Sequence, residues 1–175
     1  INPGETNYKL TKIKKVVGAD CKTTLNKVGK IYKDIIEAGI HKVSNIKVAE
    51  ASKAIENAQR DINIAFVNEV MMLSKELGIN SNEVLEAAKT KWNFLSFKPG
   101  LVGGHCIGVD PYYLAEAGKK VKFNTKIILA GRNLNDSIPN YLLKDIKKNL
   151  KKKARILLLG LSFKENVGDI RNSKS

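Results

Sequence analysis

The chain has 175 residues, of which 43% are apolar and 27% charged, and its formal net charge is +14. That apolar content is enough for a folded core and excludes wholesale disorder. The two cysteines, Cys21 and Cys106, are too few for a disulfide scaffold and too far apart for a CxxC-type site, so we expect no metal centre. No apolar run approaches the ~20 residues that a membrane helix needs, and we expect no membrane partner.

The excess positive charge comes almost entirely from lysine, since only four of the 31 basic residues are arginine. Proteins that read base edges favour arginine, whose guanidinium makes bidentate contacts. The densest basic run, residues 144–155, has apolar residues at helical spacing and no aromatic residue to stack on a base. We therefore expect a solvated basic surface and no nucleic-acid partner, with a basic nucleic-acid-binding domain as an alternative.

The first 43 residues predict a loop, a strand, a helix and a second strand. Residues 1–10 read as a loop, and the pattern of residues 11–18 predicts a strand. Apolar residues at helical spacing predict a helix over 22–38, closed by Gly39. A short strand is expected over 40–43.

The strongest element is a long helix that begins at Ser44 or Asn45 and ends near Leu77, before Gly78. Between residues 62 and 73 this helix is apolar on nearly every face, which is typical of a helix buried on two sides. One side is expected to face its own subunit and the other a partner subunit, so the pattern predicts a homodimer.

The next segment predicts a short helix, an irregular loop and a second helix. A capping box at Asn80–Glu83 opens the short helix, which extends to Ala88. Residues 90–111 are rich in glycine and are expected to be irregular. A helix is predicted from about Tyr112 to Ala117.

The last third of the chain predicts helices followed by a strand. A helix is expected from about Thr125, with Pro139 breaking or kinking it before a basic helix over 140–152. Residues 155–160 have the composition of a buried parallel strand. Because such a strand needs partners, and because there is no initiator Met, we expect the chain to be a fragment of a longer protein.

The segment with the clearest chemical content is 97–114, FKPGLVGGHCIGVDPYYL, in which four glycines surround Cys106. Glycines let the backbone approach a ligand closely, so a nucleophile is favoured here over a buried structural cysteine. His105 is adjacent in sequence, and neighbouring side chains often point apart, so a structural role for it is equally open. A cysteine hydrolase or acyltransferase using Cys106 and His105 is one alternative.

A line of polar residues lies on the long helix. Lys53 and Asn57 are four residues apart and share a face, which Arg60 and Asp61 continue. Taken alone, this pattern is typical of a solvated stripe.

The stretch from about Asn45 to Leu114 resembles the UDP-glucose/GDP-mannose dehydrogenase family, in particular the branch acting on UDP-N-acetylhexosamines. The Gly-Gly-His-Cys-Ile-Gly-Val-Asp-Pro motif carries the resemblance; INPGE at the start resembles the family's sugar-contacting loop. The resemblance implies a mostly α fold, a central helical dimerisation domain with a long central helix and strand remnants of two flanking Rossmann-like α/β domains. It places an NAD-domain remnant at 1–43, the central domain at 44–153 and the start of a nucleotide-sugar domain at 154–175.

The resemblance also implies a reaction. It is the NAD-dependent oxidation of the C6 hydroxyl of UDP-GlcNAc, UDP-GalNAc or UDP-ManNAc to a uronic acid, as in polysaccharide biosynthesis. Cys106 matches the nucleophile that forms a thiohemiacetal and then a thioester. Lys53 and Asn57 match oxyanion-stabilising residues, and Asp110 matches a residue that assists base and water chemistry. Residues matching binding positions are Phe97, Lys98, Gly100, Gly103 and Lys164 for the sugar nucleotide and Arg171 for the NAD pyrophosphate.

The chain departs from the family's pattern, since it contains no G-x-G-x-x-G after a strand. We therefore expect the 175 residues to be inactive alone. A non-catalytic helical dimerisation module is the alternative. Free thiols, the lack of a signal sequence and a nucleotide-sugar substrate favour the cytoplasm.

Overall fold

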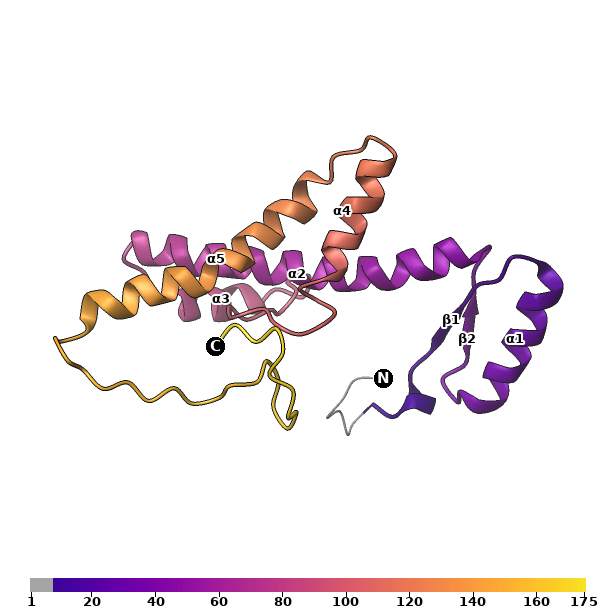
Figure 1. Ribbon diagram of the computed structural model, residues 1–175, viewed down its shortest axis with the longest axis horizontal. Coiled ribbons are helices and arrows are strands. Elements are labelled where there is room, and N and C mark those ends of the chain that lie inside the picture. The colour runs from indigo at the N-terminus through magenta and orange to yellow at the C-terminus, as the bar shows by residue number, and fades with distance from the viewer. Residues whose placement is uncertain (1–7) are drawn as a thin grey trace. The chain divides into compact units, whose positions relative to one another are not determined.

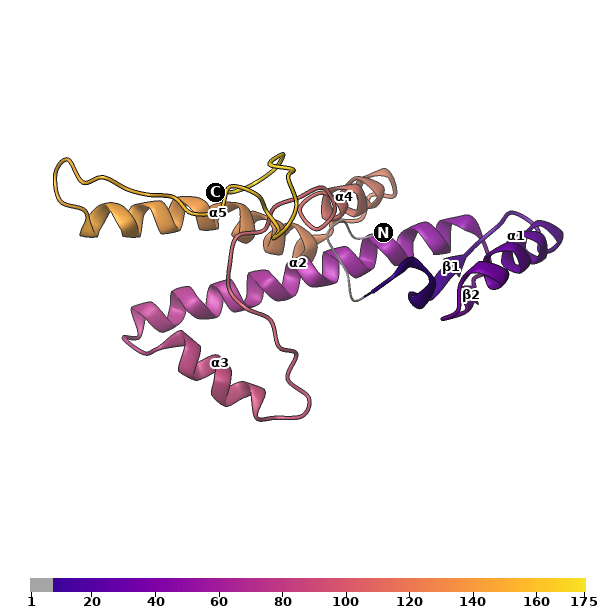
Figure 2. The ribbon, with the colours of Figure 1, turned by 90° about the horizontal axis from the view of Figure 1, so that it is seen from below.

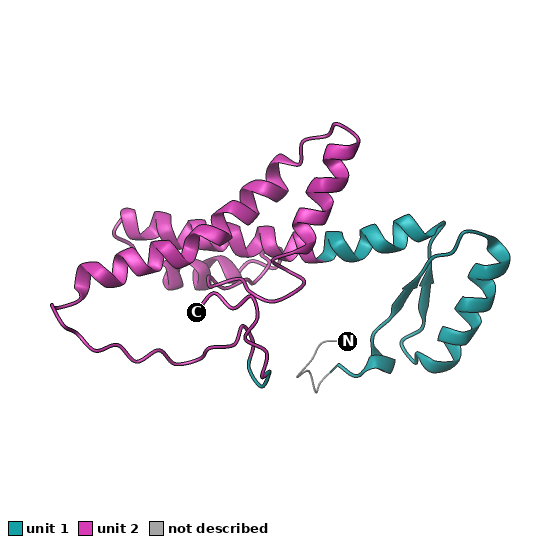
Figure 3. Ribbon diagram, viewed as in Figure 1, with its two compact units in different colours: residues 1–56, 165–167 teal, residues 57–164, 168–175 magenta. Residues whose placement is uncertain are grey.

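The computed structural model describes residues 8–175, and the INPGE segment lies outside this range. The chain divides into two compact units (Figure 3): residues 1–56 with 165–167, and residues 57–164 with 168–175. The structure is mostly helical, with one pair of strands within the part it describes. The predicted domain boundaries at 43/44 and 153/154 stay predictions.

The first unit contains a parallel β-α-β arrangement made of β1 (Lys15–Val17), α1 (Lys22–Ile35) and β2 (Ile40–Lys42). Val17, Ala19 and Ile36 are buried beneath the helix. The expected strand over 11–18 is wrong in its first half, because a turn of 3-10 helix covers Leu10–Lys12. Only the β-branched end of that segment pairs with β2, so only that end forms a strand.

The long helix α2 extends over Ile46–Glu76, which confirms the prediction. It begins where the Asn45 side chain accepts a hydrogen bond from the Val48 N–H at 3.0 Å. It ends where Gly78 takes a φ of +69° and the Ile79 N–H donates to the Ser74 carbonyl at 2.9 Å.

Helix α3 (Ser81–Lys89) follows, turns back from the end of α2 and diverges from it (Figure 2). The Asn80 side chain caps it by accepting from the Asn82 and Glu83 N–H groups. Trp92, in the turn after α3, is 96% exposed.

Helices α4 (Asp110–Lys120) and α5 (Lys126–Asn149) form a hairpin (Figure 1). Helix α4 starts two residues earlier than expected. A break of α5 at Pro139 is wrong, because a single helix continues through it. Proline removes one backbone donor, but Asn135 and Ile138, in the turn before it, are fully buried, and packing of this kind outweighs a lost helical bond.

The predicted strand over 155–160 is absent, and these residues are exposed and have no regular secondary structure. A strand forms only when its backbone pairs with another strand, and within residues 8–175 the segment 155–160 has no such partner. No helix in the same range is long and apolar enough to cross a membrane.

Candidate functional site

The candidate nucleophile lies on the irregular loop immediately before α4. Cys106 is exposed, as the glycine-rich pattern predicts. Its backbone carbonyl accepts hydrogen bonds from Val109 at 3.1 Å and Asp110 at 2.9 Å, so the loop turns directly into the first turn of α4. The loop therefore presents the thiol at a helix start.

A hydrogen bond ties this loop to α2. The Asn57 Nδ2 donates to Asp110 Oδ2 at 2.6 Å, which brings together two of the predicted catalytic residues. The solvated-stripe interpretation is wrong for Asn57 and Asp61, which are 2% and 0% exposed. Both lie on the face of α2 that α5 and the loop cover, and that cover is far away in sequence.

A second attachment holds the start of the loop. Asn68, fully buried on α2, donates to the Gly100 carbonyl at 3.0 Å and accepts from the Gly100 N–H at 2.8 Å. It also donates to Asn135 Oδ1 on α5 at 2.9 Å. A loop segment with no secondary structure thus has its backbone groups satisfied by one side chain.

A buried ion pair joins α2 to α5 between the two residues of α2 that hold the loop, Asn57 and Asn68. Arg132 on α5 bonds to Asp61 on α2, and both side chains are almost fully buried. Asn135 donates to the Asp61 backbone carbonyl and carboxylate, each at 2.8 Å. Burial raises the pKa of the Asp61 carboxyl, while the Arg132 charge opposes this rise.

Arg132 also reaches α4 and the end of the chain through Asp136. The Asp136 carboxylate accepts from Arg132 Nε at 3.2 Å, the Tyr112 hydroxyl at 3.0 Å and Lys174 Nζ at 3.0 Å. Partial burial alone would raise the pKa of Asp136, but hydrogen bonds from Lys174, Arg132 and Tyr112 hold it below its usual value. The carboxylate is therefore a charged junction of three segments.

The other predicted catalytic residue, Lys53, belongs to the first unit, where it is exposed and pairs with Glu56 at 3.2 Å. Its proximity to Cys106 stays a prediction. The roles of the predicted binding residues are likewise predictions. In the second unit, Phe97, Gly103 and Lys164 are partly buried, while Lys98, Gly100 and Arg171 are exposed.

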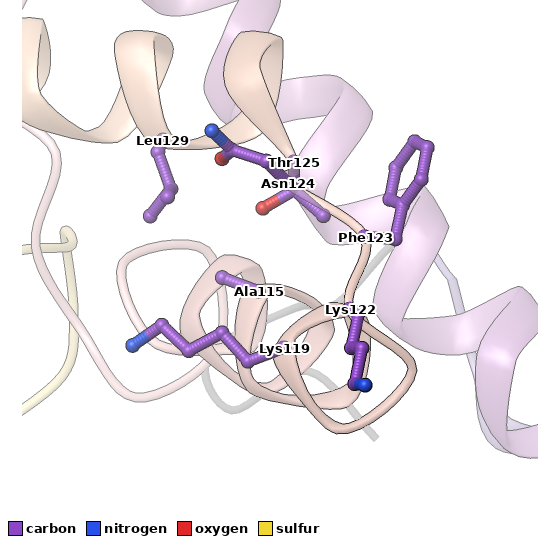
Figure 4. A pocket seen from close by; sticks show the side chains of 7 residues that line it. All are labelled: Ala115, Lys119, Lys122, Phe123, Asn124, Thr125 and Leu129. Carbon is purple, nitrogen blue, oxygen red and sulfur yellow. The ribbon is translucent and has the colours of Figure 1, made fainter.

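Two hollows lie in the second unit. One of about 170 Å³ is lined by loop glycines together with Tyr112, Asp136 and Lys174, so it adjoins the Cys106 loop. The other, about 340 Å³, lies between the end of α4 and the start of α5 (Figure 4). The amino groups of Lys119 and Lys122 point away from one another there, so they do not converge on a common anion.

Of the buried polar residues of α2 and α5, Asn57 was assigned to the site from the sequence, but Asp61, Asn68, Arg132 and Asn135 were not. A usable signal existed, because Asn57, Asp61 and Asn68 follow one another at helical spacing, the last of them inside an otherwise apolar stretch. Arg132, Asn135 and Asp136 are also at helical spacing, but this spacing fits a solvated face of the helix equally well. Among residues 8–175, no group of three or more His, Cys, Asp or Glu residues is arranged to hold a metal ion.

An exposed cysteine on a glycine-rich loop, with a carboxylate and an amide fixed beside it, defines a site suited to covalent chemistry on a carbonyl. The model of the UDP-glucose/GDP-mannose dehydrogenase family, central domain, matches residues 47–137. The chain belongs to this family.

Individual relatives agree with this assignment. The chain is 49% identical to a UDP-N-acetyl-D-glucosamine 6-dehydrogenase of Pseudomonas aeruginosa, over 99% of the chain and 43% of that protein. It is 36% identical to a UDP-N-acetyl-D-mannosamine dehydrogenase of Methanocaldococcus jannaschii, over 98% of the chain and 39% of that protein. The structure of a UDP-D-ManNAc dehydrogenase from Pyrococcus horikoshii matches with a TM-score of 0.82 and 32% identity, over 94% of the chain and 40% of that structure. The chain thus spans about two fifths of the length of these relatives.

Proposed function

We propose that the protein oxidises the C6 hydroxyl of a UDP-N-acetylhexosamine to a carboxylate, in the cytoplasm, with Cys106 as the covalent nucleophile. The observation that carries this proposal is the hydrogen bond between Asn57 and Asp110 beside the exposed Cys106 loop. The names of the relatives, which act on UDP-GlcNAc and UDP-ManNAc, support the substrate class.

The chemistry divides into two oxidations and a hydrolysis. The C6 alcohol first loses a hydride and a proton to become an aldehyde. The Cys106 thiolate adds to this aldehyde, and the resulting hemithioacetal loses a second hydride to become a thioester. Water then cleaves the thioester, which releases the carboxylate and restores the thiol.

The chain's own side chains have defined tasks in these steps. The Asn57 amide and the Lys53 ammonium stabilise negative charge on the C6 oxygen when the thiolate or water adds. Asp110, oriented by Asn57, accepts a proton from the attacking water. The 97–103 segment encloses the sugar, and Lys164 contacts the nucleotide.

The hydride acceptor proposed from the family resemblance is NAD, which when bound would supply the acceptor for the hydride of each oxidation. Of the residues described, Arg171 fits such a group, because its side chain is 77% exposed and its charge suits a pyrophosphate. The glycine-rich fingerprint of an NAD site is absent from these 175 residues, so we expect the chain alone to be inactive.

The test is an NADH-formation assay on the full-length gene product with UDP-GlcNAc, UDP-GalNAc, UDP-ManNAc and UDP-glucose. We expect two NADH per sugar with the preferred substrate and no NADH with Cys106→Ala. Cys21→Ala is the matched control, since it removes the other exposed thiol, and we expect its rate to stay within two-fold of wild type. Absence of NADH with every sugar, in a folded protein, would contradict the proposal and favour a non-catalytic module.

We also propose that a second copy of the chain packs against α2. Phe66 and Leu73 are both 57% exposed on one stripe of the helix, and Leu77, directly after its end, is 62% exposed. An apolar stripe of this kind is typical of a helix that pairs with another. We expect analytical ultracentrifugation to report a dimer for wild type and a monomer for Phe66→Glu with Leu73→Lys; an unchanged mass would contradict the proposal.

A further inference from the structure

The last residues of the chain lie against the Cys106 loop. Figures 1 and 2 show the C-terminal segment returning to the loop that precedes α4. The Gly104 N–H donates to the Asn172 carbonyl at 3.2 Å, and His105 Nε2 lies 3.0 Å from Asp169 Oδ2. These two contacts involve the two residues that directly precede Cys106.

The two glycines of the motif make this approach possible. A Cβ at Gly103 would lie 2.7 Å from the Asn172 carbonyl oxygen, closer than real Cβ contacts allow. A Cβ at Gly104, where φ is +87°, would lie 2.9 Å from the Phe163 ring. The glycine pair therefore provides the room in which the C-terminal segment lies.

Both ring nitrogens of His105 have polar partners in the C-terminal segment. With the proton on Nε2, the ring donates to Asp169. Nδ1 is then an acceptor, and Asn172 Nδ2 faces it at 3.5 Å. The edge of the ring also packs against Phe163, with centroids 6.1 Å apart. Both ring nitrogens therefore have partners other than Cys106, which argues against a Cys/His dyad.

The same carboxylate that meets His105 also holds Arg171. Asp169 accepts from Arg171 Nε at 2.9 Å and Nη2 at 2.8 Å, and from the Arg171 N–H at 3.0 Å. Hydrogen bonds from Arg171, and then from His105, hold the pKa of Asp169 well below its usual range. One ionised side chain thus joins the cysteine loop to the arginine.

We propose that His105 is a positioning residue that, through Asp169, keeps Arg171 in place beside the loop of the nucleophile. This inference rests on the proposed function, in which Arg171 meets the cofactor and Cys106 the sugar. The hydrogen bond between His105 and Asp169 therefore sets the distance between Arg171 and Cys106. Both hydride transfers depend on this distance, because it positions the cofactor relative to the sugar.

The test uses His105→Ala, Asp169→Asn and the double variant in the full-length gene product. We expect the KM for NAD to rise about ten-fold in each single variant, with the KM for the UDP-sugar within two-fold of wild type. The double variant should be no worse than the more affected single variant, because both remove one link. Additive effects, or equal changes in both KM values, would overturn the proposal.

Two further variants separate this role from general damage. His105→Gln keeps a donor for Asp169 and should restore at least half of the lost NAD affinity. His41→Ala is the matched control, since His41 is the chain's other histidine and is exposed in the first unit. No rescue by glutamine, or an equal defect in His41→Ala, would contradict a positioning role.

A readout without catalysis keeps this inference separate from the proposed function. Hydrogen exchange measured by mass spectrometry should be about ten-fold faster over residues 168–175 in His105→Ala than in wild type. If wild type forms no NADH but this exchange still accelerates, the proposed function fails and the contact stands. If exchange over 168–175 is unchanged, the proposal is wrong whatever the activity.

Discussion

The two units of the molecule differ in the burial of their polar side chains. In the first unit, polar links such as Lys12 to Glu37 and Lys42 to Asn26 lie on the surface, and the buried positions are apolar. In the second unit, the fully buried side chains include Asp61, Asn68, Arg132 and Asn135, among others. Burying such groups costs free energy. Their concentration in the second unit therefore indicates a structural role that apolar side chains cannot fill.

That role is the support of a loop without regular structure. An apolar side chain can fill space beside a loop, but it does not satisfy the backbone groups of the loop. Asn68 does this for Gly100, and it is itself held by Asn135, which is held by Asp61. This series of hydrogen bonds ends at Gly100, in the loop that carries Cys106. The buried polar residues therefore support the loop of the candidate site.

The largest expected effect follows from removing one partner of the buried ion pair. Arg132→Met leaves Asp61 charged and without its partner, and we expect a loss of about 3–5 kcal/mol in the free energy of unfolding, measured with urea. Asp61→Leu combined with Arg132→Met should lose less than Arg132→Met alone, because no charge remains buried. The surface counterpart is Lys12→Ala in the first unit, for which we expect no measurable change. A comparable loss in Lys12→Ala would remove the contrast between the units.

A smaller effect is expected for the loop attachment. Asn68→Ala leaves the Gly100 N–H and carbonyl without their partner, and we expect a loss of about 1–3 kcal/mol in the free energy of unfolding. Asn63→Ala is the matched control on the same helix, since Asn63 bonds only to the carbonyl of Gln59 one turn away. Equal losses in the two variants would show that Asn68 does no more than an ordinary helix residue.

Features that depend on neighbouring residues could be predicted from the sequence, and those that depend on distant residues could not. The ends of α2 were readable because Asn45 and Gly78 act within one turn of the helix. The burial of Asp61 depends on Arg132, which is 71 residues away, and the helical spacing around Asp61 does not identify this partner. The strand expected over 155–160 failed for the same reason, because composition supplies an apolar segment but not the neighbour it must pair with.

The candidate site shows the same division. Cys106 and its glycines were recognised from one contiguous motif, whereas the contacts of His105 required knowledge of where residues 163–172 return. The approach of Asn57 to Asp110 followed from the family resemblance and not from spacing. The sequence could predict an exposed cysteine on a glycine-rich loop, but not the set of residues that hold this loop.

Trp92 gives the molecule an intrinsic optical reporter. It is the only tryptophan in the chain, and at 96% exposure it sits in water in the turn between α3 and the segment that leads to the cysteine loop. Indole emission shifts to shorter wavelengths when the ring leaves water, so the fluorescence of the unlabelled protein records whether anything covers this turn. The proposed sugar nucleotide and cofactor can each be added in turn, and the protein can be concentrated to favour the proposed dimer. A shift of the emission to shorter wavelength would identify which of them covers Trp92.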